Sequence, residues 1–390
     1  MTPPDPTSTP VGEASASPAS TPKRTKWPRY VEAVNGLAEH WYAAIFSDEV
    51  TEGAFVPITL LGKSLLLTRS GGQVYAISDR CAHRGVKFSV QPLCFKEKTL
   101  SCWYHGWTYS LGNGEVTDIL TSPNSPIIGK VKIPVYATEE AKGLVFVFVG
   151  EGEPHPLQDD VPPGFLDPET HALGIRRRVK SNWRLGAENG IDSTHIFIHR
   201  NSVLIEANNL AIPFGVMAES RASTTFTNKK GEWPKGIEDH MAEGYYPLFD
   251  AKIGGETVLQ YLPGPDAKRV AANVSLWLPG VLKVDPWPDP SLIQYEFYVP
   301  VNESEHEYFQ LLQKKVDSEA DIEEFRRDFD EKWRDLALHG FNDDDVWARE
   351  ATEEFYCDGE GWFNEHLFPP DTPIVMWRQL VSEQARGVQP

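Results

Sequence analysis

Two short segments that each carry one cysteine and one histidine constrain the fold of this 390-residue chain more than any other feature. One residue separates Cys81 from His83. After 18 further residues comes the second pair, in which two residues separate Cys102 from His105. Two thiolates and two imidazoles can bind a tetrahedral zinc ion, or a [2Fe-2S] cluster in which both imidazoles occupy one iron. Zinc fingers pair cysteine with cysteine and histidine with histidine, whereas each pair here is mixed. The mixed order favours the cluster.

The residues around these pairs are typical of a small all-β domain. Apolar runs of strand length, LLLTR, QVYAIS and GLVFVFV, alternate with turn residues such as Gly112, Asn113 and Gly114. A proline-rich stretch at 151–168 marks a boundary, beyond which helical and strand-like patterns mix. We expect a disordered tail at 1–25, a β domain at 40–155, and an α+β domain made of 26–39 and 156–390.

In the second domain we expect strands in VSLWLPGVLKV and LIQYEFYVP, and a helix that stops near Gly340. The residues at helical spacing in that helix are Ile322, Phe325, Phe329, Trp333 and Leu336. Large aromatic residues usually lie inside a protein. We therefore expect a core that contains Trp277, Trp287, Tyr295, Phe297 and Trp333.

Composition excludes several classes of protein. The net charge of -19 argues against nucleic-acid binding, and no apolar run approaches the roughly 20 residues that span a bilayer. Four cysteines and no export signal predict a soluble cytoplasmic protein. Residues 40–142 carry ten basic and nine acidic side chains, so this part is neutral within an acidic chain. It can present a docking face to an acidic partner, for which we nominate Arg84, Lys87, Lys96 and Lys98.

A second group of metal-binding residue types lies in the α+β domain. Asp192, His195 and His199 fall at i, i+3 and i+7, which predicts one helical face. Two histidines and one carboxylate leave open positions on Fe(II) for O2. A further carboxylate can come from the Asp343-Asp344-Asp345 run, which opens a predicted helix ending near Tyr356. Spacing leaves the choice among these aspartates open, because residues in a first helical turn also act as caps.

These segments resemble the Rieske non-haem iron aromatic-ring-hydroxylating oxygenases. The first box, CAHRG, places Arg84 and Gly85 after His83, and the second reads CWYHGWTY. From about Trp41 onward, KSNWRL, ENGIDSTHIFIH, WLPGVLKV and GFNDDDVWARE are most similar to the branch of the family that dioxygenates carbazole. The resemblance implies an α+β protein with an N-terminal all-β Rieske [2Fe-2S] domain and a helix-grip catalytic domain, in which helices cover an antiparallel sheet. It also implies a homotrimer with one cluster and one mononuclear Fe2+ in each subunit.

The resemblance assigns roles to single residues. Cys81, His83, Cys102 and His105 would hold the cluster, and His195, His199 and Asp345 would hold the iron, with Asp344 as the alternative to Asp345. Asp192 would carry electrons between the His105 of one subunit and the His195 of the next. The substrate would contact the backbone carbonyl of Gly190 and the side chains of Val274, Leu282, Trp287, Gln294 and Phe341, although each apolar member of this set can equally be core.

The implied function is that of a terminal oxygenase in a multicomponent Rieske dioxygenase. It would perform angular dioxygenation of carbazole and related tricyclic aromatics, using O2 and electrons from NAD(P)H passed on by a ferredoxin reductase and a ferredoxin. The alternative is a Rieske ring-hydroxylating oxygenase, monooxygenase or demethylase acting on another aromatic compound, whose metal sites would look the same in sequence.

Overall fold

The computed structural model describes residues 26–192, 194–211, 224–227, 251–253, 256–258, 268–269, 272–368 and 371–390. The tail expected at residues 1–25 lies outside the described residues. In the described part of the chain, no helix is long and apolar enough to cross a membrane.

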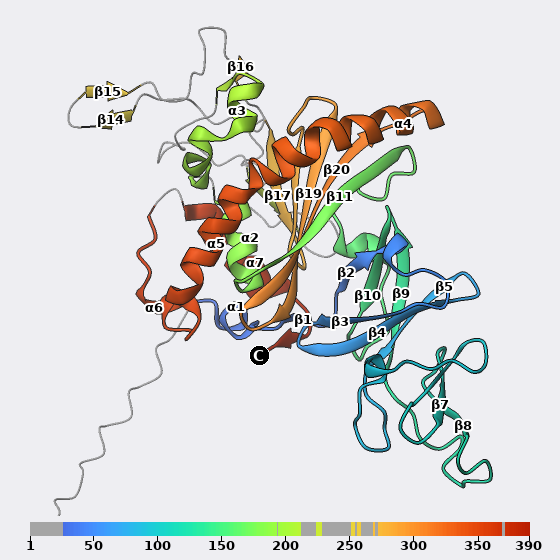
Figure 1. Ribbon diagram of the computed structural model, residues 1–390. Coiled ribbons are helices and arrows are strands. Elements are labelled where there is room, and N and C mark those ends of the chain that lie inside the picture. Colours follow the sequence, from blue (N-terminus) through green and yellow to red (C-terminus); the bar gives the residue numbers. More distant parts are fainter. Residues whose placement is uncertain are drawn as a thin grey trace, which may run out of the picture.

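The N-terminal part is built on a six-stranded antiparallel sheet (Figure 1). Its strands, in spatial order, are β2 (Trp41–Phe46), β10 (Leu144–Phe148), β9 (Val135–Ala141), β5 (Gln73–Ser78), β4 (Lys63–Ser70) and β3 (Phe55–Leu60). The three apolar runs predicted as strands become β4, β5 and β10. All five residues of β10 are buried, because this strand lies between β2 and β9.

A smaller sheet at the far end of this part positions the two cysteine–histidine segments. It contains β6 (Thr99–Ser101), β7 (Trp107–Ser110) and β8 (Val116–Ile119), with a short 3-10 turn, η2 (Phe88–Val90), beside it. Gly114 ends the turn between β7 and β8 with a φ of 70°, and a Cβ there would lie 2.0 Å from the Ile133 carbonyl oxygen. Only glycine fits this turn. Figure 1 shows β7 and β8 at the extremity of the molecule.

The C-terminal part contains a second six-stranded sheet. Its order is β11 (Thr170–Val179), β20 (Glu305–Lys315), β19 (Leu292–Asn302), β18 (Val281–Asp285), β17 (Asn273–Trp277) and β13 (Thr224–Thr227). The pairings are antiparallel except at one edge, where β13 runs parallel to β17. The runs VSLWLPGVLKV and LIQYEFYVP form β17, β18 and most of β19, as predicted.

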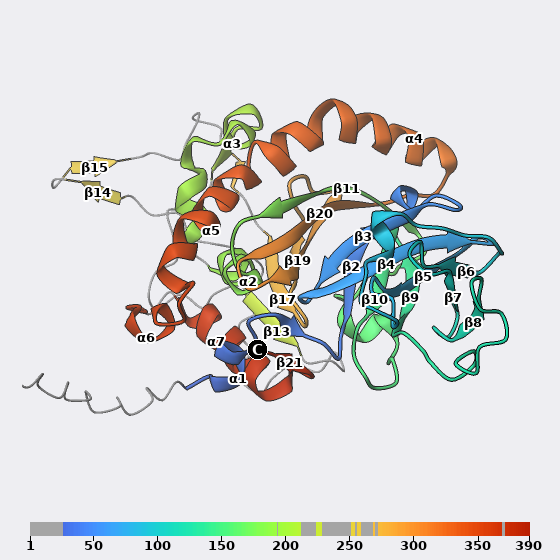
Figure 2. The same cartoon turned by 60° about the horizontal axis from the view of Figure 1, so that its bottom comes forward.

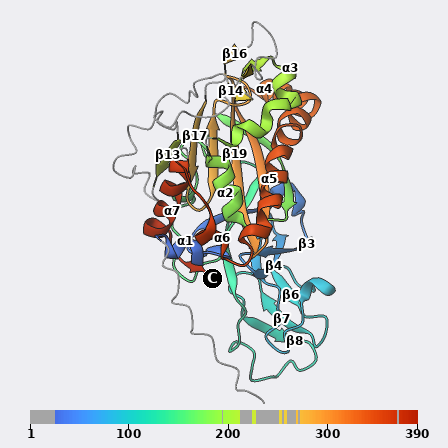
Figure 3. The same ribbon diagram turned by 90° about the vertical axis from the view of Figure 1, so that its left-hand side faces the viewer.

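Helices cover this second sheet. Figure 3 shows α2 (Trp183–Ile191) and α5 (Asn342–Tyr356) side by side over it, and both contacts, α2 with α5 and α2 with β19, are made. The long helix begins as α4 (Glu319–Asp328) and continues as the π-helix η6 (Phe329–His339), so the predicted apolar repeat does end near Gly340. It lies along the sheet in Figure 2. The remaining described elements are α1 (Pro28–Glu32), β1 (Gly36–Leu37), η1 (Ser47–Glu49), η3 (Leu157–Asp160), η4 (His195–Asn201), α3 (Val203–Ala207), β12 (Leu210–Ala211), β14 (Ala251–Ile253), β15 (Glu256–Val258), β16 (Lys268–Arg269), α6 (Gly361–Asn364), α7 (Thr372–Gln384) and β21 (Val388–Gln389).

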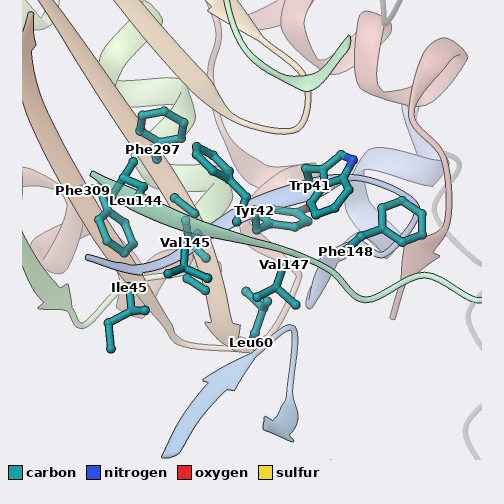
Figure 4. Packing of buried hydrophobic residues seen from close by; sticks show 14 of the residues in the cluster. Trp41, Tyr42, Ile45, Leu60, Leu144, Val145, Val147, Phe148, Phe297 and Phe309 are labelled. Atoms are coloured by element: carbon teal, nitrogen blue, oxygen red, sulfur yellow. The ribbon is translucent and has the colours of Figure 1, made fainter. Parts of the chain in front are cut away.

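The two sheets share one hydrophobic core. Figure 4 shows residues of both sheets in this core: Val145 of the first sheet lies near Phe309 of the second, and Trp41 packs beside Phe148. All five aromatic residues expected in the core are buried. Near the C-terminus, β1 pairs with β21, and Tyr30 and Leu37 pack in the core of the C-terminal part. The chain therefore returns at its end to the segment that precedes the N-terminal sheet.

Two candidate metal centres

The two cysteine–histidine segments have the same main-chain frame. In the first, Cys81 N–H donates to the Val86 carbonyl at 3.0 Å and Gly85 N–H donates to the Cys81 carbonyl at 2.8 Å. In the second, Cys102 N–H donates to Trp107 at 2.7 Å and Gly106 N–H donates to Cys102 at 2.9 Å. Both glycines have positive φ, 71° and 67°. The signal in the sequence was a glycine four residues after each cysteine.

These paired loops place the sulfurs inside and the imidazoles outside. Cys81 and Cys102 are buried, whereas His83 is exposed and His105 is half-buried. The two imidazole centroids are 4.6 Å apart, and the His83 ring stacks on Trp107 with an interplanar angle of 2°. Burial raises the pKa of the Cys102 thiol, and the adjacent Cys81 thiol raises it further. Two buried sulfurs and two outward imidazoles fit a Rieske cluster with its histidine-bound iron towards solvent.

Tyr109 completes this site, and sequence reasoning missed it. Its hydroxyl lies 3.1 Å from Cys81 Sγ and accepts the Ala82 N–H at 3.1 Å. Burial and the nearby thiol raise the pKa of Tyr109 well above its usual range, so the hydroxyl stays protonated. A protonated hydroxyl can donate to Cys81 Sγ when that sulfur is a thiolate, the form in which it would bind a cluster.

The expectation of a single helical face for Asp192, His195 and His199 is wrong. Helix α2 ends at Ile191, and His195 and His199 lie on the 3-10 segment η4. Asp192 causes the break: its Oδ1 accepts from the Thr194 N–H at 2.7 Å and from the Thr194 hydroxyl at 2.8 Å. A short polar side chain that bonds nearby backbone competes with helix continuation in this way.

Despite the break, the structure brings His195, His199 and Asp345 together. Asp345 Oδ1 lies 3.6 Å from His195 Nε2 and 3.4 Å from His199 Nε2. Both His199 Nε2 and Asp345 Oδ1 are fully buried and make no hydrogen bond. Buried polar atoms without a partner are costly. These two atoms and His195 Nε2 converge on one point, which fits a metal ion of the two-histidine, one-carboxylate class.

The neighbouring aspartates take other positions. Asp344 Oδ2 lies 3.3 Å from His199 Nδ1, on the side of the ring away from Asp345, and Asp343 pairs with Arg177. Burial alone would lower the pKa of His199, but Asp345 and Asp344 outweigh it and raise that pKa to about 9. Burial likewise opposes ionisation of Asp345, yet His199 and His195 hold its pKa well below the usual range.

The two centres occur together in one known architecture. Residues 40–136 match the model of the Rieske [2Fe-2S] domain, and residues 148–389 match that of the homotrimeric ring hydroxylases. The chain belongs to this ring-hydroxylase family. Its members carry a Rieske cluster and a mononuclear iron, for which the two groups of residues above have the right donor atoms.

Individual relatives support the same membership. The chain is 49% identical over 373 residues to the terminal oxygenase component of carbazole 1,9a-dioxygenase from a Sphingomonas species, covering 95% of this chain and 98% of the relative. A solved terminal oxygenase from Nocardioides aromaticivorans is 57% identical with a TM-score of 0.87, covering 94% and 99%. A carbazole-bound oxygenase variant in a ferredoxin complex of carbazole 1,9a-dioxygenase is 43% identical with a TM-score of 0.85, covering 93% and 94%.

In this ring hydroxylase, part of the predicted set of substrate residues lies beside His199, a predicted iron ligand. Phe341 stacks on His199 at 3.7 Å, and Trp287 packs against Phe341 at 5.0 Å. Gly190 lies on α2 against the Leu282 side chain. Val274 lies on β17 and packs in the same part of the core as Leu282, and Gln294 is buried on β19 with its Nε2 donating to Glu296 at 2.5 Å. Sequence reasoning missed Tyr298, whose hydroxyl lies against Gly190, and also Glu296 and Arg349, which bond Tyr298 and Asn189 respectively.

A third group, His40, His155 and Asp160, also has metal-binding residue types. Here the Arg386 guanidinium donates to Asp160 at 3.0 Å and contacts the His155 ring nitrogens at 2.6 and 2.8 Å. A guanidinium is permanently cationic, so it takes the place that a metal ion would need. The group is an ion-paired junction between the two parts of the chain.

Proposed function

We propose that this chain is the terminal oxygenase of a multicomponent dioxygenase that attacks carbazole and related tricyclic aromatics at the angular position. Both atoms of O2 would add to the ring carbon that bears nitrogen and to its neighbour, with consumption of two electrons and two protons. The C–N bond of the resulting product then opens to give an aminobiphenyl-diol. The observation that carries the proposal is the convergence of His195, His199 and Asp345 in a chain so similar to carbazole oxygenases.

In this proposal Cys81, His83, Cys102 and His105 hold the cluster, and His195, His199 and Asp345 hold the iron. When bound, the cluster supplies electrons one at a time and the iron supplies the site at which O2 reacts. Asp344 orients His199 from its other nitrogen, as carboxylates commonly do for metal-bound histidines.

The Gly190 carbonyl is suited to accept the ring N–H of carbazole. In a continuous helix its partner would be the Thr194 N–H, but that group donates to the Asp192 carboxylate. The carbonyl thus lies at a helix end without its usual donor, where partial negative charge gathers. The apolar side chains of Leu282, Trp287 and Phe341 would hold the rings and exclude water, with Val274 and Gln294 completing the wall.

Electron transfer between the two centres would cross a subunit boundary. We call the loops that carry Cys81 with His83 and Cys102 with His105 the cluster loops. Within one chain they lie at the far end of the N-terminal part, well away from α2 and α5 (Figure 1). We place Asp192 on the electron-transfer route at the subunit boundary, between the neighbouring subunit's His105 and this chain's His195. Its Oδ1 is occupied by Thr194, and His195 Nδ1 faces the Asp192 carbonyl oxygen. The main-chain carbonyl of Asp192 therefore orients His195, and the Asp192 carboxylate is the group that we place on the route between the subunits.

A ferredoxin would dock over the cluster loops. Arg84, Lys87, Lys96 and Lys98 are all exposed there. Arg84→Glu with Lys87→Glu should slow reduction by ferredoxin in a salt-dependent way and leave reduction by dithionite unchanged. Equal slowing with both donors would show damage to the cluster and contradict the docking role.

The test of the substrate uses the purified protein with carbazole, O2 and a reducing ferredoxin system. Mass spectrometry should detect the ring-opened aminobiphenyl-diol, with both inserted oxygens labelled when 18O2 is supplied. Simple monohydroxylation of carbazole would favour the alternative monooxygenase or demethylase. So would the absence of any carbazole product from a protein that consumes O2 normally with another aromatic compound. We place the protein in the cytoplasm, since none of its four cysteines forms a disulfide bond.

A further inference from the structure

A buried ion pair, Arg349 with Glu296, connects α5 to β19. Arg349 and Glu296 are 1% and 4% exposed, and Arg349 Nη2 lies 3.6 Å from Glu296 Oε2. The guanidinium also lies over the rings of Tyr308 and Tyr298, at 4.4 and 5.0 Å from their centroids. Its two Nη atoms are fully buried without a hydrogen bond. The pair is thus fully removed from water but not arranged for the strongest attraction.

One side of the pair holds the end of α2. Arg349 Nε donates to Asn189 Oδ1 at 2.6 Å, immediately before Gly190. Glu296 Oε2 accepts the Tyr298 hydroxyl at 2.5 Å, and that hydroxyl would lie only 2.3 Å from a Cβ at Gly190. Asn189 is therefore held by Arg349, and the Gly190 backbone rests on a tyrosine that Glu296 orients.

The other side of the pair holds the start of α5. Asn342 Nδ2, at the first position of α5, donates to Glu296 Oε1 at 3.2 Å. Arg349 lies one helical turn after Asp345 on the same helix, α5. The same two side chains therefore hold Asn189 at the end of α2 and Asn342 at the start of α5, the helix that carries Asp345.

We propose that Glu296 and Arg349 are positioning residues that set the distance between the Gly190 carbonyl and the iron ligand Asp345. The carbonyl would hold the substrate nitrogen, and Asp345 would hold the iron, so this distance decides which ring carbon faces the iron. Only the part of this inference that concerns substrate orientation rests on the proposed function. Iron binding at Asp345 can be measured without any substrate.

The geometry argues against a purely stabilising pair. A buried ion pair with poor hydrogen bonding often gains nothing over an apolar replacement, so it is weak evidence for stability. Its hydrogen bonds are instead made to Asn189, next to Gly190, and to Asn342, at the start of the helix that carries Asp345. A displacement of about 1 Å at such groups can cost roughly 100-fold in rate.

The experiment compares trimeric variants with intact clusters. Arg349→Met alone leaves Glu296 as an unpaired buried charge and can fail to fold, so the main variant is Arg349→Met with Glu296→Gln. Arg386→Met is the matched control, since Arg386 belongs to a buried ion cluster at the junction of the two parts and contacts none of these residues. Arg349→Lys tests charge without the Nε bond to Asn189.

Three quantities are measured: the dissociation constant of Fe(II) by anaerobic chelator competition, the fraction of consumed O2 that appears in product, and the product regioisomers. We expect the double variant to bind iron about 10–100-fold more weakly, to release more hydrogen peroxide and to give a mixture of ring positions. Arg349→Lys should keep most of the iron affinity and lose regioselectivity. The control should match wild type in all three, even with a similar loss of thermal stability.

Wild-type iron affinity, coupling and regioselectivity in the folded double variant would overturn the proposal, as would equal losses in the Arg386→Met control. If wild type itself makes no angular product from carbazole, the proposed substrate fails. The iron dissociation constants of the variants still decide whether Glu296 and Arg349 position Asp345.

Discussion

At the scale of residues, the three aspartates at the start of α5 show how one step along a helix changes the role of a side chain. Successive residues point about 100° apart. Asp343 therefore reaches Arg177, Asp344 reaches the outer nitrogen of His199, and Asp345 faces the inner nitrogens of both histidines. Two neighbouring carboxylates thus contact one imidazole from opposite sides.

This difference gives distinct expectations for Asp345→Ala and Asp344→Ala. Asp345→Ala, like His195→Ala and His199→Ala, should abolish mononuclear iron and leave the visible spectrum of the cluster unchanged. Asp344→Ala removes only the partner of a ligand, so it should weaken iron binding by about 10–100-fold. Iron and acid-labile sulfide are measured on each variant. Stoichiometric mononuclear iron in Asp345→Ala would show that the ligand assignment is wrong.

Asp192→Asn separates the local and the electron-transfer roles of that residue. An asparagine Oδ1 can still accept both Thr194 hydrogen bonds, so the end of α2 should keep its shape. We expect normal trimers with both metal sites, a cluster that accepts electrons at the normal rate, and single turnover from the reduced trimer at least about 10-fold slower. A near-normal single-turnover rate would leave Asp192 with its local role alone.

At the scale of elements, the cluster loops owe their positions to β7. This strand begins directly after the second loop, and its residue Tyr109 reaches across to Cys81 in the first. A tyrosine two residues after a tryptophan in a buried strand looks like ordinary core in sequence. Only the pairing of the two loops turns its hydroxyl towards sulfur.

Tyr109→Phe removes one hydrogen bond to a charged sulfur and keeps the ring. Such bonds are worth about 1.5 kcal/mol, which corresponds to roughly 60 mV for a one-electron couple. Because the bond is stronger to the reduced, more negative cluster than to the oxidised one, its loss should lower the reduction potential by up to about that amount. Protein-film voltammetry provides the measurement, and Tyr75→Phe, whose hydroxyl bonds the exposed Gln73, is the control. An unchanged potential would mean that Tyr109 has only a packing role.

At the scale of the whole molecule, Asp160 joins the two parts of the chain. This carboxylate is 1% exposed and contacts His40 at 2.7 Å, His155 at 2.6 Å and Arg386 at 3.0 Å. Burial opposes its ionisation, but His40 and His155 outweigh burial and lower the pKa of Asp160 to about 2. The carboxylate of Asp160 therefore joins three segments: the proline-rich stretch that contains it, the residue before β2 (His40), and the C-terminal segment that contains Arg386.

The lowered pKa predicts how stability depends on pH. A carboxyl whose folded pKa is below its unfolded value stabilises the fold above the unfolded pKa and loses that contribution as pH falls. Asp160→Asn should therefore cost on the order of 2 kcal/mol at pH 7. The difference between the two proteins should persist to about pH 4 and fall by roughly half near pH 3. Thermal midpoints at pH 7, 4 and 3 test this, and a difference that grows on acidification would contradict it.

Much of this protein follows from local sequence. Ligand spacing within each cluster loop, the glycines four residues after the cysteines, and the alternation of β4, β5 and β19 are set by neighbours along the chain. Short-range patterns of this kind report strands, turns and paired ligands directly. They were sufficient to recognise two metal sites and the family.

Contacts between distant segments were decided by tertiary structure. His199 and Asp345 are 146 positions apart, and spacing left Asp344 and Asp345 equal until α5 packed beside α2. The sequence also predicted one helix through His195, because periodicity does not show that Asp192 bonds Thr194 and ends α2. Glu296 and Arg349 carried no local signal at all. Their meaning depends on three elements packing around one buried pair, and packing is a property of the whole fold.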